Sequence, residues 1–155
     1  MLTQLKQLSI EAEGRFATAS ELAFLTEYLA SAPKRLSAYE KIHAAQEQIM
    51  DEIEADLTAI DAQAFMKGSR DVSEICRRDR KDTLRYTAAA MLFNDLSYLR
   101  DGLLLWQRTI VHAVQDQKAS ALTWREMPEV LRRHLTPEEA DLIMPALQVN
   151  QALLN

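Results

Sequence analysis

The chain has 155 residues, of which 48% are hydrophobic and 26% charged, and its formal net charge is −5. This length and apolar content suffice for one buried core, so we expect a single domain over residues 1–155. The acidic balance argues against a nucleic-acid binder, which needs a clustered basic surface. No run approaches eighteen apolar residues, so no membrane insertion is expected.

The residue types used in the chain and its N-terminal segment narrow the class of protein further. The single cysteine excludes an internal disulfide and matches no zinc-ligand spacing. The N-terminal residues lack the basic region and unbroken apolar run of a secretory signal, and we therefore expect a cytoplasmic protein. With only three glycines and four prolines, and abundant Ala, Leu, Glu, Gln and Arg, the composition favours helix over β-turns.

In the first half of the chain, apolar spacing predicts three helices. The first covers residues 3–13 and ends at Gly14, and the second covers residues 20–30. Pro33 suits the first turn of a third helix that reaches about residue 62. After an interruption at residues 66–69, Ser69 or Asp71 could cap a fourth helix, which carries the cysteine.

In the second half, a bend at Asn94 and Asp95 precedes a helix over residues 96–117. Two patterns of the capping-box type, Thr123-Trp-Arg-Glu126 and Thr136-Pro-Glu-Glu139, predict two further helix starts. No strand pattern of useful length is present. We therefore predict an all-α domain of roughly seven helices.

The fourth helix carries the most informative residues. One face is apolar, with Leu84, Ala88, Met91 and Leu92 at helical spacing. Another face groups a thiol with polar side chains three and four residues apart: Cys76, Asp79, Arg80 and Thr83. The helix N-terminus and the neighbouring arginines predict a Cys76 thiol that ionises readily.

Several ordinary interpretations compete for these residues. Cys76 could be a small buried hydrophobe, and Asp79 could form ion pairs with its basic neighbours. A Cys–His enzyme is not supported because the three histidines lie on other predicted helices without a motif, so we expect no enzyme. Haem ligation by a histidine such as His112 is a further alternative, against an ordinary role for each histidine.

A thiol, a carboxylate and nearby arginines on one helix also match one ligand class. Asp79 could accept N–H groups, Cys76 could form a covalent bond, and arginines could bind carboxylates. Linear tetrapyrroles offer inner pyrrole N–H groups, two propionates and a side chain open to thiol addition.

The same segment resembles a known family. Cys76-Arg-Arg-Asp79, Leu84-Arg85-Tyr86, and Ala90-Met91-Leu92 with Asp95 are similar in order and spacing to the chromophore helix of phycobiliproteins, particularly allophycocyanin-type subunits. Gly14-Arg15-Phe16 and Tyr98-Leu-Arg-Asp-Gly102-Leu103 extend the resemblance. It implies a globin-like bundle with two extra N-terminal helices, which we assign to residues 1–31, before a core over residues 33–155.

The resemblance also implies roles for individual residues. Cys76 matches the thioether attachment site, Asp79 the carboxylate that bridges the inner pyrrole nitrogens, and Arg78 a propionate contact. Helix geometry makes Arg80, on the face of the thiol, a rival for that contact. Glu11 and Arg85 match an acidic residue and an arginine that pair across the subunit interface in family dimers, so an intersubunit salt bridge between them is predicted.

Departures from the family pattern modify the expected function. Asp71, Val72 and Glu74 stand where the family has a longer loop and a basic pair, and two carboxylates there should weaken binding of propionates. Phe93 and Asn94 replace small residues. The chain therefore resembles an outlying relative, similar to the divergent globins associated with bilin biosynthesis.

The expected function is that of a non-enzymatic globin that binds or handles a phycocyanobilin-like bilin, with or without covalent attachment to Cys76. It would act with bilin-making enzymes or in phycobilisome assembly, as a homodimer or a phycobilisome-type subunit. The alternatives are a pigment-free scaffold or regulatory globin that docks onto antenna or biosynthetic proteins, and a haem-binding globin.

Overall fold

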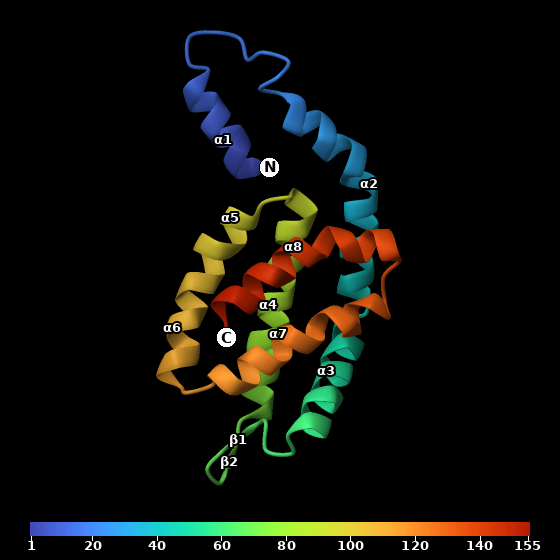
Figure 1. The fold of residues 1–155 in the computed structure, drawn as a ribbon, viewed down its shortest axis with the longest axis vertical. Coiled ribbons are helices and arrows are strands. Elements are labelled where there is room, and N and C mark those ends of the chain that lie inside the picture. Colours follow the sequence, from blue (N-terminus) through green and yellow to red (C-terminus); the bar gives the residue numbers. More distant parts are fainter.

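The computed structural model describes all residues from 1 to 155 and is helical apart from one short hairpin (Figure 1). The helices are α1 (Leu2–Glu11), α2 (Ala23–Ala44), α3 (Gln46–Ile60), α4 (Ser73–Phe93), α5 (Leu96–Leu99), the π-helical segment η1 (Arg100–Leu104), α6 (Leu105–Ala113), α7 (Gln117–Arg132) and α8 (Pro137–Leu153). Because α5, η1 and α6 run on without a break, the chain forms seven continuous helices. The all-α prediction is confirmed.

The core lies where α4 and α8 meet α2, and where α7 packs against α3 and α8. Apolar residues at helical spacing on α3 fill one side of it, and the large ring of Trp124 on α7 is 2% exposed. The fully buried α3 residues are Ile49, Met50, Ile53 and Leu57. Leu84, Ala88 and Met91 of α4 are buried as predicted, whereas Leu92 is only partly buried.

The hairpin between α3 and α4 was not expected from the sequence. Strand β1 (Met66–Lys67) pairs antiparallel with β2 (Arg70–Asp71), and Gly68, with φ of 63°, lies in the turn between them. Strands of two residues are too short to produce an alternating pattern. None of the helices combines the length and the apolar character needed to cross a bilayer.

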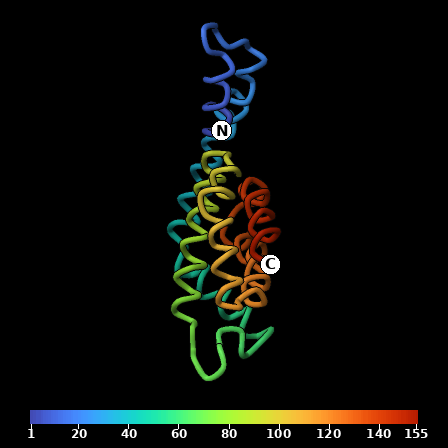
Figure 2. The backbone as a smooth tube through the Cα atoms, turned by 90° about the vertical axis from the view of Figure 1, so that its left-hand side faces the viewer, coloured from blue at the N-terminus to red at the C-terminus, as the bar shows by residue number.

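The first part of α2 and all of α1 form an arm that extends beyond the body of the molecule (Figures 1 and 2). The predicted break at Ser31–Pro33 is wrong, because α2 continues through Pro33. Proline removes one helical hydrogen bond, and contacts beside it offset that loss. Arg35 donates from Nε to Ser31 Oγ (2.8 Å) and from Nη1 to the Met91 carbonyl oxygen (2.6 Å), which ties α2 to the end of α4.

The break falls instead at Ala45, which separates α2 from α3 within the stretch predicted as one helix. A boundary at residues 31–33 between an N-terminal pair and a core would therefore cut a continuous helix. The predicted division of the domain into residues 1–31 and 33–155 stays a prediction. We therefore use the word arm only for α1 and the first part of α2, without a boundary at residue 31.

Asp95 anchors the arm to the body. Its carboxylate accepts from Thr3 N (2.6 Å), Thr3 Oγ1 (2.9 Å) and Tyr98 N (3.2 Å), so it caps the first turn of α1 and of α5 together. The residue is 3% exposed. Burial pushes the pKa of Asp95 upward, but the bonds from Thr3 and Tyr98 and the nearby N-terminal amino group hold it below its usual value.

Of the capping signals, Thr136 and Glu139 form the predicted box at the start of α8, with Pro137 at the first position. The box predicted at Thr123 is wrong: Thr123 is buried inside α7, which already begins at Gln117, and its hydroxyl donates to the Ala119 carbonyl oxygen (2.8 Å). Asp71 lies just before α4 and accepts from Ser73 N (2.8 Å), although the residue at the cap itself is Val72.

Candidate ligand-binding site

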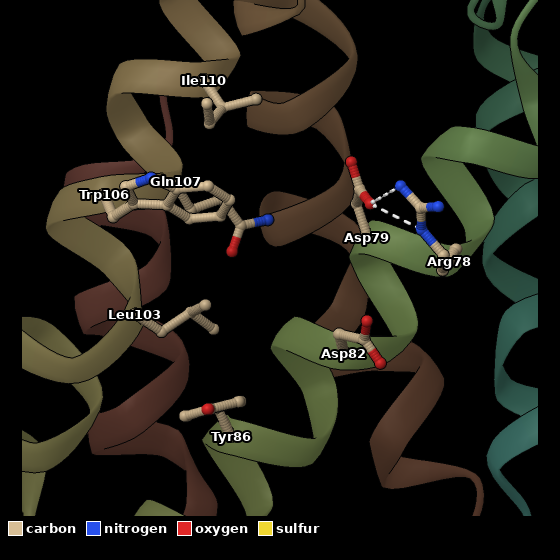
Figure 3. A pocket seen from close by; sticks show the side chains of 8 residues that line it. All are labelled: Arg78, Asp79, Asp82, Tyr86, Leu103, Trp106, Gln107 and Ile110. Carbon is tan, nitrogen blue, oxygen red and sulfur yellow. Dashed lines mark hydrogen bonds and ion pairs between the residues drawn. The ribbon is translucent and has the colours of Figure 1, made fainter.

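A cleft of about 440 Å³ lies between α4 and the helix formed by η1 and α6 (Figure 3). One wall comes from α4 and the other from the stretch around the π-helical turn. The lining residues are Arg78, Asp79, Asp82, Tyr86, Leu103, Trp106, Gln107 and Ile110. Pockets for drug-sized organic ligands commonly have a volume in this range and a similar mix of apolar walls with a few polar groups.

Helical spacing explains how each wall forms. Asp79, Asp82 and Tyr86 follow one another at steps of three and four along α4, so they form a stripe on one face. Leu103, Trp106 and Ile110 do the same on the opposite wall. The wider π turn at Arg100–Leu104 includes Leu103, immediately precedes the α6 residues Trp106 and Ile110, and resets the register of the helix. π-helical turns of this kind are often found at functional sites.

The polar groups of the cleft are concentrated on the α4 wall. Arg78 donates from Nε (3.3 Å) and Nη2 (3.2 Å) to the same oxygen of Asp79, Oδ1, which leaves Oδ2 without a protein partner (Figure 3). Asp82 accepts from Arg85 Nη1 (3.2 Å). The α4 wall thus carries two carboxylates and one guanidinium, and a ligand rich in N–H groups fits the free oxygen of Asp79.

The opposite wall is mainly apolar. Trp106 is 66% exposed, and its indole ring lies along the cleft beside Leu103 and Ile110 (Figure 3). Gln107 is the one amide there, and its Oε1 accepts from Thr83 Oγ1 (2.6 Å). A flat, unsaturated ligand could therefore pack against the indole while its polar edge meets α4.

Cys76 is half-buried and does not line the cleft. Its sulfur lies 4.0 Å from Asp116 Oδ2, at the start of α7. Burial, and then the charge of Asp116, raise the pKa of the Cys76 thiol, so the prediction of a readily ionised thiol is wrong. The neighbouring Arg77 does not compensate, because it is turned toward α3 and pairs with Glu54 (2.9 Å) and with other carboxylates there.

Arg80 also lies outside the cleft. It is 7% exposed, donates from Nη2 to Glu54 Oε1 (2.8 Å) and stacks on the ring of Phe65 at 4.6 Å. These contacts hold the guanidinium of Arg80 against α3 and Phe65, away from the cleft that Asp79 lines. Arg80 is therefore an unsuitable propionate contact. Of the four residues predicted to bind a cofactor, the structure brings Arg78 and Asp79 together in the cleft.

The acidic residues before Cys76 do not enter the cleft either. Asp71 is exposed just before the start of α4, and Glu74 lines a second, charged groove on α4 that shares Arg78 and Asp82 with the cleft. The weakening of ligand binding expected from these two carboxylates is therefore unsupported by their positions. The carboxylate that sequence reasoning missed is Asp82, which lies in the cleft itself.

The apolar wall was also missed. The spacing of Leu103, Trp106 and Ile110 marks one face of a helix, but periodicity cannot tell a face that packs against protein from one that borders a cleft. The high exposure of the Trp106 ring, which only the structure gives, identifies that wall.

No histidine lines the cleft. His112 Nδ1 lies 3.0 Å from Gln117 Nε2, His134 Nε2 lies 3.1 Å from Glu52 Oε1, and His43 stacks on Tyr39. Haem ligation in a globin requires a histidine that faces the haem pocket. The haem alternative is therefore unsupported by the placement of these side chains.

The two predicted interface residues are both exposed. Glu11 accepts from Gln7 Nε2 (2.9 Å) at the end of α1, and Arg85 projects from α4. The arm also exposes large apolar side chains, among them Phe16 (97%) and Leu29 (67%). An apolar surface of this kind suits a protein contact, while the intersubunit pairing itself stays a prediction.

Reversing the charge of one interface residue tests the pairing. The variant Glu11→Arg should shift sedimentation toward the monomer, because two cations would then face each other, and adding Arg85→Glu should restore association. The matched control is Glu138→Arg, an exposed site at the start of α8. Unchanged sedimentation of Glu11→Arg in a self-associating protein would show that this pair does not form.

The structure combines an all-α body, an N-terminal helical arm and an amphipathic cleft beside α4, an arrangement consistent with the globin-like bundle expected from the sequence. The family model described as phycobilisome protein matches residues 8–153, nearly the whole chain. The chain therefore belongs to the phycobilisome protein family, whose members are globin-like, generally non-enzymatic proteins that typically bind linear tetrapyrroles and assemble into oligomers. No curated protein matches the chain.

Proposed function

We propose that this protein binds a linear tetrapyrrole reversibly in the cleft between α4 and α6, without enzymatic activity. The observation that carries the proposal is the free Oδ2 of Asp79, which faces a cleft with an aromatic opposite wall. The inner pyrrole N–H groups of a bilin would donate to this oxygen, and the conjugated rings would pack against Trp106.

Arg78 is the cation best placed for a propionate. Its side chain is 71% exposed at the edge of the cleft, and one N–H-bearing end already holds Asp79. A guanidinium has five donors, so the same side chain can orient Asp79 and bind a carboxylate of the ligand. Arg78 and Asp79 thus supply both charges that a bilin requires.

The position of Cys76 favours reversible binding over attachment. A thioether would form by addition of the thiol across an ethylidene group of the bilin, with the sulfur bonding to carbon and the proton passing to the adjacent carbon. The reactive form is the thiolate, and burial beside Asp116 disfavours it. A site that releases its pigment suits a protein that transfers bilin from the enzymes that make it, or toward phycobilisome assembly, in the cytoplasm.

Titration of the purified chain with biliverdin, followed by absorption and fluorescence, tests the proposal. Binding should sharpen and intensify the long-wavelength absorption band, because the cleft holds the flexible pigment in one extended shape. A spectrum identical to that of free biliverdin at saturating protein would contradict the proposal. Haemin serves as a comparison ligand, since the cleft offers it no histidine.

The covalent alternative is tested separately. After co-expression with a bilin source, a denaturing gel stained with zinc should show no fluorescent protein band, because a noncovalent pigment is lost on unfolding. The Cys76→Ala variant should match the native chain in its reversible binding of bilin. A zinc-fluorescent band that disappears in Cys76→Ala would instead establish a thioether at that residue.

A second candidate function, a pigment-free scaffold, is favoured by the arm. Phe16 and Leu29 present apolar surface and do not line the cleft, so a partner could bind there whether or not the cleft holds pigment. Such a scaffold would dock onto antenna or biosynthetic proteins. It predicts no spectral change in the biliverdin titration, so the same measurement separates the two candidates.

A further inference from the structure

Gln107 is the only amide side chain in the cleft, and its orientation is set by a buried hydroxyl. Thr83 is fully buried, and its Oγ1 lies 2.6 Å from Gln107 Oε1 and 2.8 Å from the Asp79 carbonyl oxygen. With the amide oxygen held against α4, the amide nitrogen points into the cleft on the side of Asp79 (Figure 3). No protein acceptor takes the N–H groups of that nitrogen.

Electrostatics favours the same orientation. The carboxylate of Asp79 faces Gln107 across the cleft, and the positive end of an amide dipole is attracted toward a carboxylate (Figure 3). The opposite orientation would turn the amide oxygen toward that negative charge. The cleft therefore offers an acceptor on the α4 wall, Asp79 Oδ2, and a donor on the α6 wall, Gln107 Nε2.

These two groups specify the chemistry of the ligand between them. It must give N–H groups to Asp79 and a hydrogen-bond acceptor to Gln107. A linear tetrapyrrole meets both demands, because its inner rings carry N–H groups and each terminal ring ends in a lactam carbonyl. A cyclic tetrapyrrole such as haem has no ring carbonyl and holds its nitrogens around the iron.

We propose that Gln107 determines specificity by donating from Nε2 to a terminal lactam carbonyl, and that Thr83 positions its amide. The inference rests on the proposed bilin-binding function and adds the residue that distinguishes an open-chain ligand from a macrocycle. Gln107 contacts the ligand, whereas Thr83 acts through Gln107. The π-helical turn at Arg100–Leu104 contributes by setting the register that brings residue 107 opposite Thr83.

The variant Gln107→Met tests the donor without changing charge or length. Thr83 stays satisfied in this variant, because its single hydroxyl proton, given to Gln107 Oε1 in the native chain, can turn to the Asp79 carbonyl oxygen 2.8 Å away. We expect affinity for biliverdin to fall by about five- to tenfold, the loss typical of one hydrogen bond to a ligand. The lactam C=O stretch in the Raman spectrum should move to higher wavenumber. Affinity for haemin should not change, so the preference for biliverdin should fall by the same factor.

Matched controls separate this effect from a general disturbance of the fold. Gln151→Met makes the same change on the exposed surface of α8 and should leave affinity and C=O stretch unaltered. Thr83→Val removes the hydroxyl that positions the amide and should broaden the C=O band, while Thr109→Val, on the exposed side of α6, should not. Thermal unfolding of each variant, compared with that of the native chain, should show that the fold is retained.

The outcomes distinguish this inference from the function on which it rests. If the native chain binds biliverdin and Gln107→Met binds it equally, or with an unmoved C=O stretch, Gln107 does not donate to the lactam and the inference is wrong. If Thr83→Val retains a sharp, unshifted band, Thr83 is not a positioning residue. If the native chain does not bind biliverdin, the proposed function and this inference fall together.

Discussion

Replacing Asp79 with asparagine should weaken bilin binding by about tenfold or more. A hydrogen bond to a charged group contributes about 1.5–3 kcal/mol, and asparagine would lose the charge that holds inner pyrrole N–H groups. Because the Asp79 side chain is 44% exposed, the lower end of that range applies. The measurement is the dissociation constant of biliverdin, obtained from the absorption titration.

Two further variants sharpen the test of Asp79. Asp141→Asn makes the same change on the exposed surface of α8 and should bind biliverdin like the native chain. Asp82→Asn removes the other carboxylate of the cleft, which already accepts from Arg85, and should cost less than Asp79→Asn. A large loss for Asp82→Asn with none for Asp79→Asn would move the N–H acceptor from residue 79 to residue 82.

Replacing Glu139 with glutamine should destabilise the fold by about 3 kcal/mol at neutral pH. Glu139 is 5% exposed and joins α8 to α2. Its Oε1 and Oε2 accept from Lys41 Nζ (2.8 and 2.7 Å), and it also accepts from Ser37 Oγ (2.7 Å) and Thr136 N (2.9 Å). Removing one partner of a buried pair costs about 3–5 kcal/mol, and Lys41, which is partly exposed, recovers some hydration.

The effect of Glu139→Gln should depend on pH in a defined direction. Burial pushes the pKa of Glu139 upward, but the bonds from Lys41, Thr136 and Ser37 outweigh it and hold the pKa at about 2. A lowered pKa in the folded state means that the carboxylate stabilises the protein above its unfolded pKa, and that this contribution is lost as pH falls toward 2. The difference in unfolding free energy between the native chain and the variant should therefore shrink over that acidic range.

Glu138→Gln is the matched control for this prediction. Glu138 lies beside Glu139 in the first turn of α8, is exposed and makes no ion pair. Its replacement removes only a favourable interaction with the helix dipole, worth about 0.3–1 kcal/mol. Denaturant unfolding of both variants at several pH values makes the comparison, and equal losses for the two would refute the special role of Glu139.

A capping-box pattern in the sequence predicted the structure correctly at one of its two occurrences. Thr136 and Glu139 satisfy the helix start reciprocally, with Pro137 at the first position, and the box forms as predicted. The same pattern at Thr123 failed because its residues lie inside a longer helix, where the threonine hydroxyl bonds to the preceding turn. A capping-box pattern therefore forms a cap only where a helix begins, and the spacing of the pattern alone does not show where that is.

Long-range contacts decided the features that the sequence did not predict. The hydrogen bond from Arg35 to the Met91 carbonyl oxygen ties α2 to α4 just beyond Pro33, yet nothing beside Pro33 in the sequence indicates it. Cys76 was expected to ionise because of its basic neighbours along the chain, but Asp116, forty residues away, lies against its sulfur. Such contacts depend on how the helices pack.

For the candidate site, the family resemblance was a better guide than spacing alone. It favoured Arg78, which lines the cleft, whereas grouping by helical face favoured Arg80, which is buried against Glu54. Neither approach found Trp106 or Gln107, because the opposite wall is fixed by the π-helical turn and by the packing of α6 against the body. Residues on the α4 wall of the site could therefore be predicted from the sequence, whereas those on the α6 wall could be identified only from the structure.

Amide chemical-shift mapping tests most directly whether a bilin binds, and whether it binds in the cleft between α4 and α6. Titration of the isotope-labelled chain with biliverdin should perturb amides over residues 78–86 and 103–110, the two walls of the cleft, and leave α1 unchanged. Perturbations confined to the arm, or none at saturating ligand, would contradict bilin binding in this cleft.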